Sequence, residues 1–250
     1  MPTAVAALLS QATGGIQKVD IDMNIAVLTN EYPPNAYGGA GVHVEYLTRE
    51  VARLADGQHH VRVLCFGDQD EQAATISVTG VQPPVEILSQ DPRHERLFST
   101  LLQGLVMGGA LADIDLVHCH TWYTHFAGCL GKYLHGVPLV LTTHSLEPHR
   151  PWKVEQLGTA YHASTWVERT AYHNADGVIA VSESMKHDVQ SLYGVPPERI
   201  LVTSKPAARI WRSSVSANRH FSSKCTVAGI RARSVRHTRS ACHGASVMKC

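Results

Sequence analysis

The 250-residue sequence predicts an α/β fold, in which helices cover both faces of a Rossmann-like, doubly wound parallel sheet. Short runs rich in Val, Ile and Leu alternate with longer segments of helical periodicity, as in successive βα units. A hydrophobic content of 44% is enough for a sizeable core. In such a sheet, ligands bind beyond the carboxyl ends of the strands, so the residues that end each run are the first candidates for a site.

Six short apolar runs predict buried strands, and five longer segments between them predict helices. The strands are Asn24–Asn30, His60–Phe66, Val85–Leu88, Asp115–His120, Pro138–His144 and Gly177–Ser182. The helices are Val42–Leu54, His94–Leu111, Tyr123–Leu134, Val154–Ala175 and Glu183–Leu192. We expect residues 23–202 to form a single α/β domain.

The composition favours a cytoplasmic protein without a membrane anchor. No apolar run approaches the roughly 18 residues of a membrane span. The short run Ala4–Leu9 has no basic residue before it, unlike a secretory signal. Cys65, Cys119 and Cys129 fall on predicted strands or a helix, so we expect buried free thiols in a reducing compartment, without disulfides.

The two ends of the chain differ from this regular body. Residues 1–22 contain no element that we can place, and a start codon assigned too early or a short disordered leader would explain them. From Thr203 onward there are 10 basic residues and no acidic ones, which leaves 12 of the 22 basic residues against all 21 acidic residues in the body. We expect residues 203–250 to be a disordered basic tail. A frameshift, an unspliced segment or a gene-model error near codon 203 is our hypothesis for its origin.

A genuine basic tail is the alternative, and such a tail could bind nucleic acid through its charge. It holds one Trp and one Phe and no recognisable module for reading bases. No specific nucleic-acid partner is therefore expected.

Polar and aromatic residues gather where the predicted strands end. His120 and Trp122 close one strand, and His144 closes the next. A core strand has no packing reason to finish in such residues, so we interpret these three as site residues. Ser182, directly before Glu183, is better explained as a helix N-cap.

A glycine-rich turn, Gly38-Gly39-Ala40-Gly41, follows the first strand and opens the first helix. Its spacing is not that of a dinucleotide-binding fingerprint or of a nucleotide-triphosphate loop. Glycines at a helix N-terminus allow backbone N–H groups to approach an anion. They also allow a helix and a strand to pack closely, and the pattern alone does not decide between the two.

Two patterns resemble metal sites, but no metal and no cofactor are expected. Asp113-Ile114-Asp115 has the spacing of a metal-binding Asp-x-Asp, yet it precedes a strand and is interpreted as a solvated turn. His118 and His120 share one face of a strand and could meet His144. No acidic or cysteine ligand joins them at a convincing spacing for zinc.

Four motifs, in order, resemble the N-terminal domain of the retaining glycosyltransferases of the glycogen and starch synthase kind. They are NIAVLTNEYPPNAYGGAGVHVEYL, DLVHCHTWYTHFAG, PLVLTTHSLEPHRPWKVEQLG and STWVERTAYHNADGVIAVSESMKHDV. The turn YGGAGVH is similar to that of a bacterial glycogen synthase branch. A better-known branch has Lys where this chain has Ala36, so a phosphate contact by that Lys is not carried over.

The resemblance implies the N-terminal half of a GT-B architecture, in which two Rossmann-like domains face each other across a cleft. It implies transfer of glucose from ADP-glucose or UDP-glucose to an α-1,4-glucan with retention, and leaves a small sugar phosphate open as acceptor. Gly38, Gly39 and Gly41 would lie against the donor diphosphate, and His144 would lie beside the transferred glucose as the catalytic residue. His120, Thr121 and Trp122 would line the acceptor side of the cleft.

In the family a second domain grips the nucleotide, and no sequence resembling it follows Val202. We therefore expect little or no glucosyl transfer by this chain. Two other functions stay open: glucan binding without catalysis, and nucleic-acid binding through the tail. The sequence does not indicate an oligomeric state.

Overall fold

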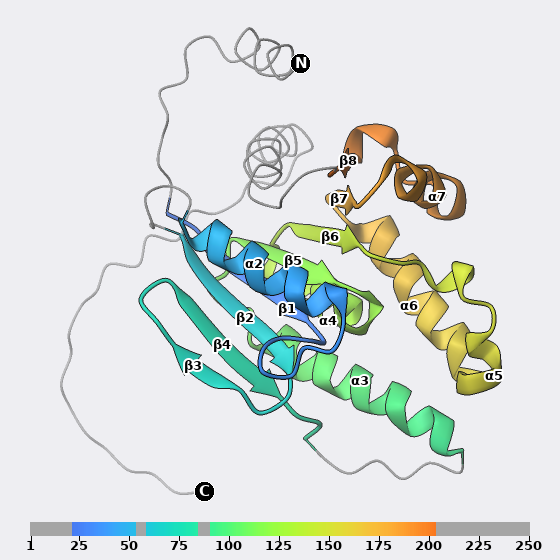
Figure 1. Ribbon diagram of the computed structural model, residues 1–250, viewed down its shortest axis with the longest axis horizontal. Helices are drawn as coiled ribbons and strands as arrows, with labels where there is room; N and C mark the ends of the chain where they lie inside the picture. The colour runs from blue at the N-terminus through green and yellow to red at the C-terminus, as the bar shows by residue number, and fades with distance from the viewer. Residues whose placement is uncertain (1–21, 54–58, 85–90, 204–250) are drawn as a thin grey trace, which may run out of the picture.

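The computed structural model describes residues 22–53, 59–84 and 91–203. An eight-stranded sheet runs through this part of the chain in the order β3-β4-β2-β1-β5-β6-β7-β8 (Figure 1). All neighbouring strands are parallel except β3 and β4 at one edge. The predicted α/β class is confirmed. The strands are β1 (Asn24–Thr29), β2 (His60–Phe66), β3 (Asp70–Gln72), β4 (Ile76–Val81), β5 (Leu116–His120), β6 (Leu139–Thr143), β7 (Gly177–Ala180) and β8 (Ile200–Val202).

Helices cover both faces of the sheet. The helix α2 packs on one face, α3, α4 and α6 pack on the other, and α7 packs beside β7 and β8 (Figure 1). The described helices are α2 (Gly39–Arg53), α3 (Pro92–Gly109), α4 (His125–His135), α5 (Lys153–Leu157), α6 (Ala160–Asn174) and α7 (Glu183–Tyr193).

The central strands supply both layers of the core. In β1, Ile25 and Val27 belong to the cluster under α2, while Ala26 and Leu28 belong to the cluster under α3 and α4. All four side chains are fully buried. A strand buried on both faces carries apolar residues at every position, which is why NIAVLT appears as a continuous apolar run and not as an alternating one.

The structure differs from the sequence-based prediction at one helix and adds three strands. The predicted helix Val154–Ala175 is two helices, because Gly158 adopts φ 55° and ends α5. The strands β3, β4 and β8 were not predicted. The predicted strand Val85–Leu88 lies outside the described residues. So do the predicted flanks 1–22 and 203–250, apart from Asp22 and Thr203.

Local capping agrees with the sequence. The Ser182 hydroxyl accepts a hydrogen bond of 3.1 Å from the N–H of Met185, which confirms this residue as the N-cap of α7. Asp91 caps α3 by accepting from the N–H of Arg93. The predicted turn at Asp113 is also present, with φ 60°, before β5. Cys65, Cys119 and Cys129 are buried free thiols, as expected.

The order of strands reverses between β1 and β5. From β1 the chain proceeds outward to β2 and β4, and from β5 it proceeds in the other direction to β8. The carboxyl ends of β1 and β5 therefore flank the topological switch point, where open α/β sheets form their ligand crevice.

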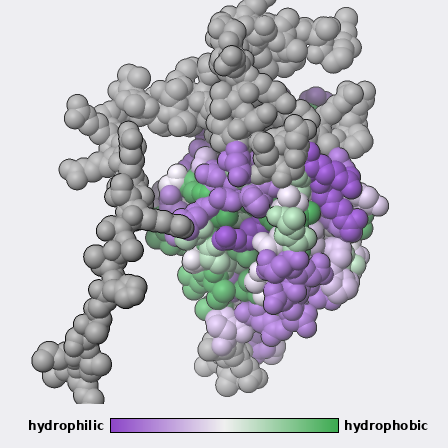
Figure 2. All heavy atoms as spheres, turned by 90° about the vertical axis from the view of Figure 1, so that its left-hand side faces the viewer, coloured by the Kyte–Doolittle hydropathy of each residue, from purple (hydrophilic) through white to green (hydrophobic). Residues whose placement is uncertain are grey.

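The described surface shows no large apolar face toward the β3–β4 edge. Figure 2 views the molecule from that side, and hydrophilic side chains cover much of the face with smaller hydrophobic areas between them. Among the described residues, no helix combines the length and the hydropathy required to cross a membrane.

Candidate active site

A chain of polar contacts joins the two strand ends at the switch point. The hydroxyl of Thr121, directly after β5, donates a 2.7 Å hydrogen bond to the amide oxygen of Asn30, directly after β1. The amide nitrogen of Asn30 lies 3.5 Å from Oε1 of Glu31. Thr121 has φ 67°, a conformation that costs a β-branched residue about 1–3 kcal/mol. The Asn30 contact is one of the interactions that hold it there.

Glu31 continues these contacts into the glycine turn. Its Oε2 accepts hydrogen bonds from the N–H of Gly38 at 2.8 Å and from the N–H of Tyr37 at 3.3 Å. The turn thus already holds one anion, a carboxylate of the protein itself. In the described part of the chain, no recorded acceptor binds the N–H groups of Gly39, Ala40 and Gly41, which open α2. These three donors are the ones left to bind a ligand anion.

The glycines of the turn differ in how closely they are packed. A Cβ on Gly41 would lie 2.9 Å from Cβ of Ala36 and 3.0 Å from Cβ of Glu31, so the close packing requires glycine. A Cβ on Gly39 would meet nothing within 4 Å. Gly41 therefore permits close packing, whereas Gly39 leaves open space at the helix N-terminus; whether an anion binds there stays a prediction.

Four histidines lie next to one another below this turn. Nδ1 of His120, at the end of β5, is 3.2 Å from Nε2 of His144, which follows β6. The rings of these two are stacked, with centroids 5.5 Å apart. The ring of His118, on the same face of β5, has its centroid 4.4 Å from that of His120. The fourth member, His43 of α2, approaches His144 edge-on at 5.0 Å.

Burial keeps these histidines neutral. Desolvation, with a smaller contribution from neighbouring histidines, lowers the pKa of His118 to about 3 and that of His144 to about 4. The pKa of His120 is well below its usual value for the same reasons, and burial also lowers the pKa of His43. At neutral pH the histidines are therefore uncharged and can still form hydrogen bonds with a ligand.

The hydrogen bond between His120 and His144 couples their tautomers. One nitrogen of the pair must donate and the other accept, so the proton position on His120 determines which nitrogen of His144 is protonated. His118 is held by a 2.7 Å contact between its Nε2 and the hydroxyl of Thr142. Nδ1 of His118 and Nε2 of His120 have no partner among the described residues.

His43, His120 and His144 could together hold a metal ion. Their ligand nitrogens lie within 4.8 Å of one another, and within the described residues they form the group of this kind with suitable geometry. The set differs from the sequence-based candidate, since His43 replaces His118. No carboxylate or thiolate belongs to the group, so it lacks the anionic ligand with which many catalytic zinc sites are completed.

Trp122 has less free surface than the sequence suggested. Its side chain is 7% exposed and stacks on Tyr123 with ring centroids 4.4 Å apart. One face of the indole is therefore covered by protein. The indole N–H has no hydrogen-bond acceptor among the described residues.

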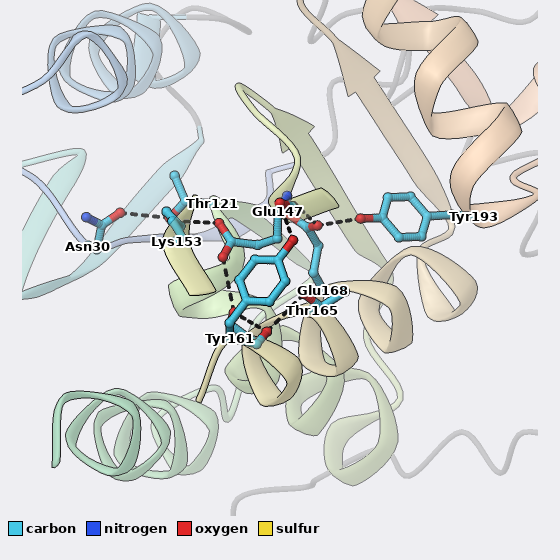
Figure 3. Close-up of polar contacts among 9 residues, drawn as sticks. Asn30, Thr121, Glu147, Lys153, Tyr161, Thr165, Glu168 and Tyr193 are labelled. Atoms are coloured by element: carbon cyan, nitrogen blue, oxygen red, sulfur yellow. Dashed lines mark hydrogen bonds and ion pairs between the residues drawn. The ribbon is translucent and has the colours of Figure 1, made fainter. Parts of the chain in front are cut away.

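A buried polar network holds the loop that follows His144 in place (Figure 3). The N–H of Glu147 donates to Oε2 of Glu168 at 2.9 Å, and the hydroxyl of Tyr193 donates to the same oxygen. Lys153 forms a 2.6 Å ion pair with Glu147, whose other carboxylate oxygen accepts from the hydroxyl of Ser164 at 3.1 Å. Residues from α5, α6 and α7 thus position the loop between β6 and α5.

The structure brings together most of the residues that the sequence proposed. His120 and His144 contact each other and His43 of α2. Thr121 is connected to the glycine turn through Asn30 and Glu31, and Trp122 directly follows Thr121. Sequence reasoning missed His43 and the role of Glu31. A cavity of about 230 Å³ lies at the opposite edge of the sheet, near the amino ends of β1, β2 and β4. It is not part of this site.

The comparisons with known proteins show the family of the chain. Residues 37–206 match glycosyltransferase family 4. The chain is 44% identical over 185 residues to an α-maltose-1-phosphate synthase of Mycolicibacterium smegmatis, which covers 72% of this chain and 43% of that protein. It is 32% identical over 197 residues to a glycogen synthase of Mycobacterium tuberculosis, which covers 69% of this chain and 45% of that protein. The chain therefore spans less than half the length of these curated relatives.

A solved structure supports the fold. A sucrose-phosphate synthase of Thermosynechococcus elongatus superposes with a TM-score of 0.51 at 19% identity, covering 72% of this chain and 47% of that one. At this sequence identity, the superposition is evidence for the fold and not for the function. The expected kinship with glycogen synthases holds at the level of the family, and the α-maltose-1-phosphate synthase is the more similar of the two relatives. Together, the match over residues 37–206 and the fold identify the chain as a member of glycosyltransferase family 4, with the fold of a GT-B domain.

Proposed function

We propose that residues 23–202 are the N-terminal domain of a retaining glucosyltransferase that uses a nucleotide sugar, with ADP-glucose as the favoured donor. The observation that carries this proposal is the contact of His120 with His144, next to His43 of the helix that the glycine turn opens, in a family 4 domain. Donor cleavage develops negative charge on the leaving phosphate. The free N–H groups of Gly39 and Gly41, at the positive end of α2, would stabilise that charge.

His144 would lie beside the transferred glucose in this proposal. A neutral imidazole can donate to one sugar hydroxyl without repelling the positive charge that develops on the sugar. His120 would position it, because the 3.2 Å contact fixes the ring and its tautomer. Thr121 and Trp122 would contribute to the acceptor side.

A small sugar phosphate is the favoured acceptor, ahead of an α-1,4-glucan. The relative at 44% identity is an α-maltose-1-phosphate synthase, and the glycogen synthase is 32% identical. Maltose 1-phosphate contains one glucosyl residue joined to glucose 1-phosphate. Transfer of a single glucose to glucose 1-phosphate would therefore form it, whereas a glycogen synthase extends a polymer.

A test pairs this chain with the half that its relatives possess in addition. The 250-residue chain is assayed alone and after co-expression with the C-terminal half of the M. smegmatis relative. We expect negligible transfer from labelled ADP-glucose by the chain alone, because both halves of a GT-B cleft contact the substrates. Label should enter maltose 1-phosphate in the paired sample, and His144→Ala should abolish this.

The outcomes separate the alternatives. Label in glycogen but not in maltose 1-phosphate would favour the polymer as acceptor. No transfer by a paired sample that forms a stable complex would contradict the proposed function, and retention of the chain on amylopectin would then support a binding module.

A further inference from the structure

A second cavity, of about 80 Å³, lies beside the candidate active site. It opens between the first turn of α3, the residues after β5, and the α5–α6 segment. Lys153, in its wall, pairs with Glu147, which follows His144 by three residues. The wall combines apolar residues, Leu97, Leu157 and Ala160, with polar and aromatic ones, among them Arg93, Arg96, Lys153, Trp122, Tyr123 and Ser164.

Two of the three cations in the wall already have carboxylate partners. Arg93 makes hydrogen bonds of 2.7–3.1 Å from its guanidinium to Asp91. Lys153 is held by Glu147 at 2.6 Å (Figure 3). These pairs fix both cations in place at the edge of the cavity, so neither has to be ordered when a ligand arrives.

Arg96 is the cation without such a partner. No ion pair or side-chain hydrogen bond is recorded for its guanidinium within the described part of the chain, and it follows Arg93 by nearly one helical turn. It lies close enough to Tyr123 to lower the pKa of that phenol, as does Arg150, against the larger opposing effect of burial. The wall therefore carries an excess of positive charge after its two carboxylates are counted.

The side chains of the wall that carry polar hydrogens are donors. Arg93, Arg96, Lys153 and Ser164 all line the cavity, and Trp122 lies in the same wall with its side chain 7% exposed. Arginine, lysine and hydroxyl groups all donate, and the ligand that suits these groups has several acceptor oxygens and negative charge.

We propose that this cavity is the subsite for the phosphate group of a sugar-phosphate acceptor, with Arg96 as the residue that recognises it. This inference rests on the proposed glucosyltransferase function and names the acceptor class of the same site. The volume of about 80 Å³ admits a small anion. A glucan chain has no group that would need the excess charge.

The geometry also explains a glycine. Gly158, between α5 and α6, has φ 55°, and a Cβ there would lie 2.8 Å from the guanidinium carbon of Arg93. Beside it, the hydroxyl of Thr159 contacts His94 at 2.8 Å. These two contacts pack α3 closely against the α5–α6 segment beside the cavity.

The test measures binding to the 250-residue chain as it stands. Inorganic phosphate, glucose 1-phosphate, glucose and ADP are each titrated at constant ionic strength. The readout is the ¹H–¹⁵N signal of the Trp122 indole, assigned from its loss in Trp122→Phe. Arg96→Gln is compared with Arg49→Gln, a change at an exposed arginine of α2 that pairs with Glu45. Circular dichroism confirms that both variants fold.

We expect phosphate and glucose 1-phosphate to shift the Trp122 signal, and glucose and ADP to leave it nearly unchanged. Arg96→Gln should weaken phosphate binding at least about tenfold, the effect of losing a charged hydrogen bond. Arg49→Gln should bind as the wild type does. Equal phosphate affinity in Arg96→Gln, or a Trp122 shift with maltotriose and none with phosphate, would overturn the inference.

The paired-half assay separates this result from the proposed function. If the pair forms maltose 1-phosphate and Arg96→Gln leaves the KM for glucose 1-phosphate unchanged, the function stands and the subsite is wrong. If phosphate binding depends on Arg96 but no acceptor receives glucose, the subsite stands and the function is wrong.

Discussion

The hydroxyl of Thr121 and the amide oxygen of Asn30 lie 2.7 Å apart across 91 residues of sequence. This contact joins the ends of β1 and β5 at the switch point. Thr121→Val keeps the shape and the β-branch at φ 67° but removes the donor, so the change isolates the hydrogen bond. We expect a loss of about 1 kcal/mol in the free energy of unfolding, measured with urea.

The control for this change is Thr170→Val. Thr170 is exposed on α6, and its hydroxyl bonds only to the carbonyl of Trp166 in the same helix. We expect a change within about 0.5 kcal/mol there. An equal effect of both substitutions would mean that the Thr121–Asn30 bond does not stabilise the switch point.

Gly39 and Gly41 should respond in opposite ways to the same substitution. Gly41→Ala places a Cβ 2.9 Å from Ala36, so the turn must move, at a cost of about 1–3 kcal/mol. Gly39→Ala meets nothing within 4 Å and should be neutral or slightly stabilising in α2. Thermal unfolding of the two variants at equal protein concentration tests this contrast. Similar melting temperatures would contradict it.

The buried histidines should make the fold sensitive to acid. The folded pKa values, about 3 for His118 and His125 and about 4 for His144, are below the unfolded value near 6.5. The unfolded chain therefore binds more protons between these values, and stability is lost as the pH falls from about 6.5 toward 4. Urea unfolding at pH 7.5, 6 and 5 should show a decline of several kcal/mol in total. A flat profile would contradict it.

His125 offers a direct test of that cause. It is 1% exposed, both ring nitrogens lack partners among the described residues, and it packs edge-on against Tyr172. His125→Leu should leave stability at pH 7.5 unchanged or higher, since no hydrogen bond is lost. Its stability should fall less than that of the wild type between pH 6 and 5.

Glu168 should act in the opposite direction. Burial raises its pKa to about 7, so the folded chain retains a proton there that the unfolded chain releases near 4.5. The stability that this group contributes is present below about 4.5 and is lost as the pH rises through 7. Glu168→Gln, which resembles the protonated acid, should therefore be more stable relative to the wild type at pH 8.5 than at pH 5.5. A constant difference would show that Glu168 is not the titrating group.

Sequence periodicity predicted the elements that are buried on both sides. An apolar run such as Asn24–Thr29 is compatible with few structures other than a buried strand. The predicted strand Val85–Leu88 lies outside the described residues and stays a prediction. β4, Ile76–Val81, was missed because Ser77, Thr79 and Gly80 interrupt its apolar pattern near the edge of the sheet. Ile76 and Val78, two residues apart, were the available signal. The break at Gly158 was missed because helical spacing continues on both sides of it.

The site could be predicted only where a motif marks a strand end. His120 and His144 follow apolar runs, and their meeting follows from adjacent parallel strands. His43 lies within α2, where a histidine resembles an ordinary surface residue, and only the tertiary fold brings it 5.0 Å from His144. Glu31 lies at the end of the first apolar run, but its contact with Gly38 could not be predicted because it depends on the path of the turn.

The contacts from Thr121 through Asn30 and Glu31 to Gly38 tie the loop after β5 to the loop after β1. These hydrogen bonds hold the two loops in a fixed relative position, so a movement of either loop would strain the other. A substrate that bound between the two loops would therefore find both already ordered. The conformational entropy of the loops is lost during folding and not at each binding event.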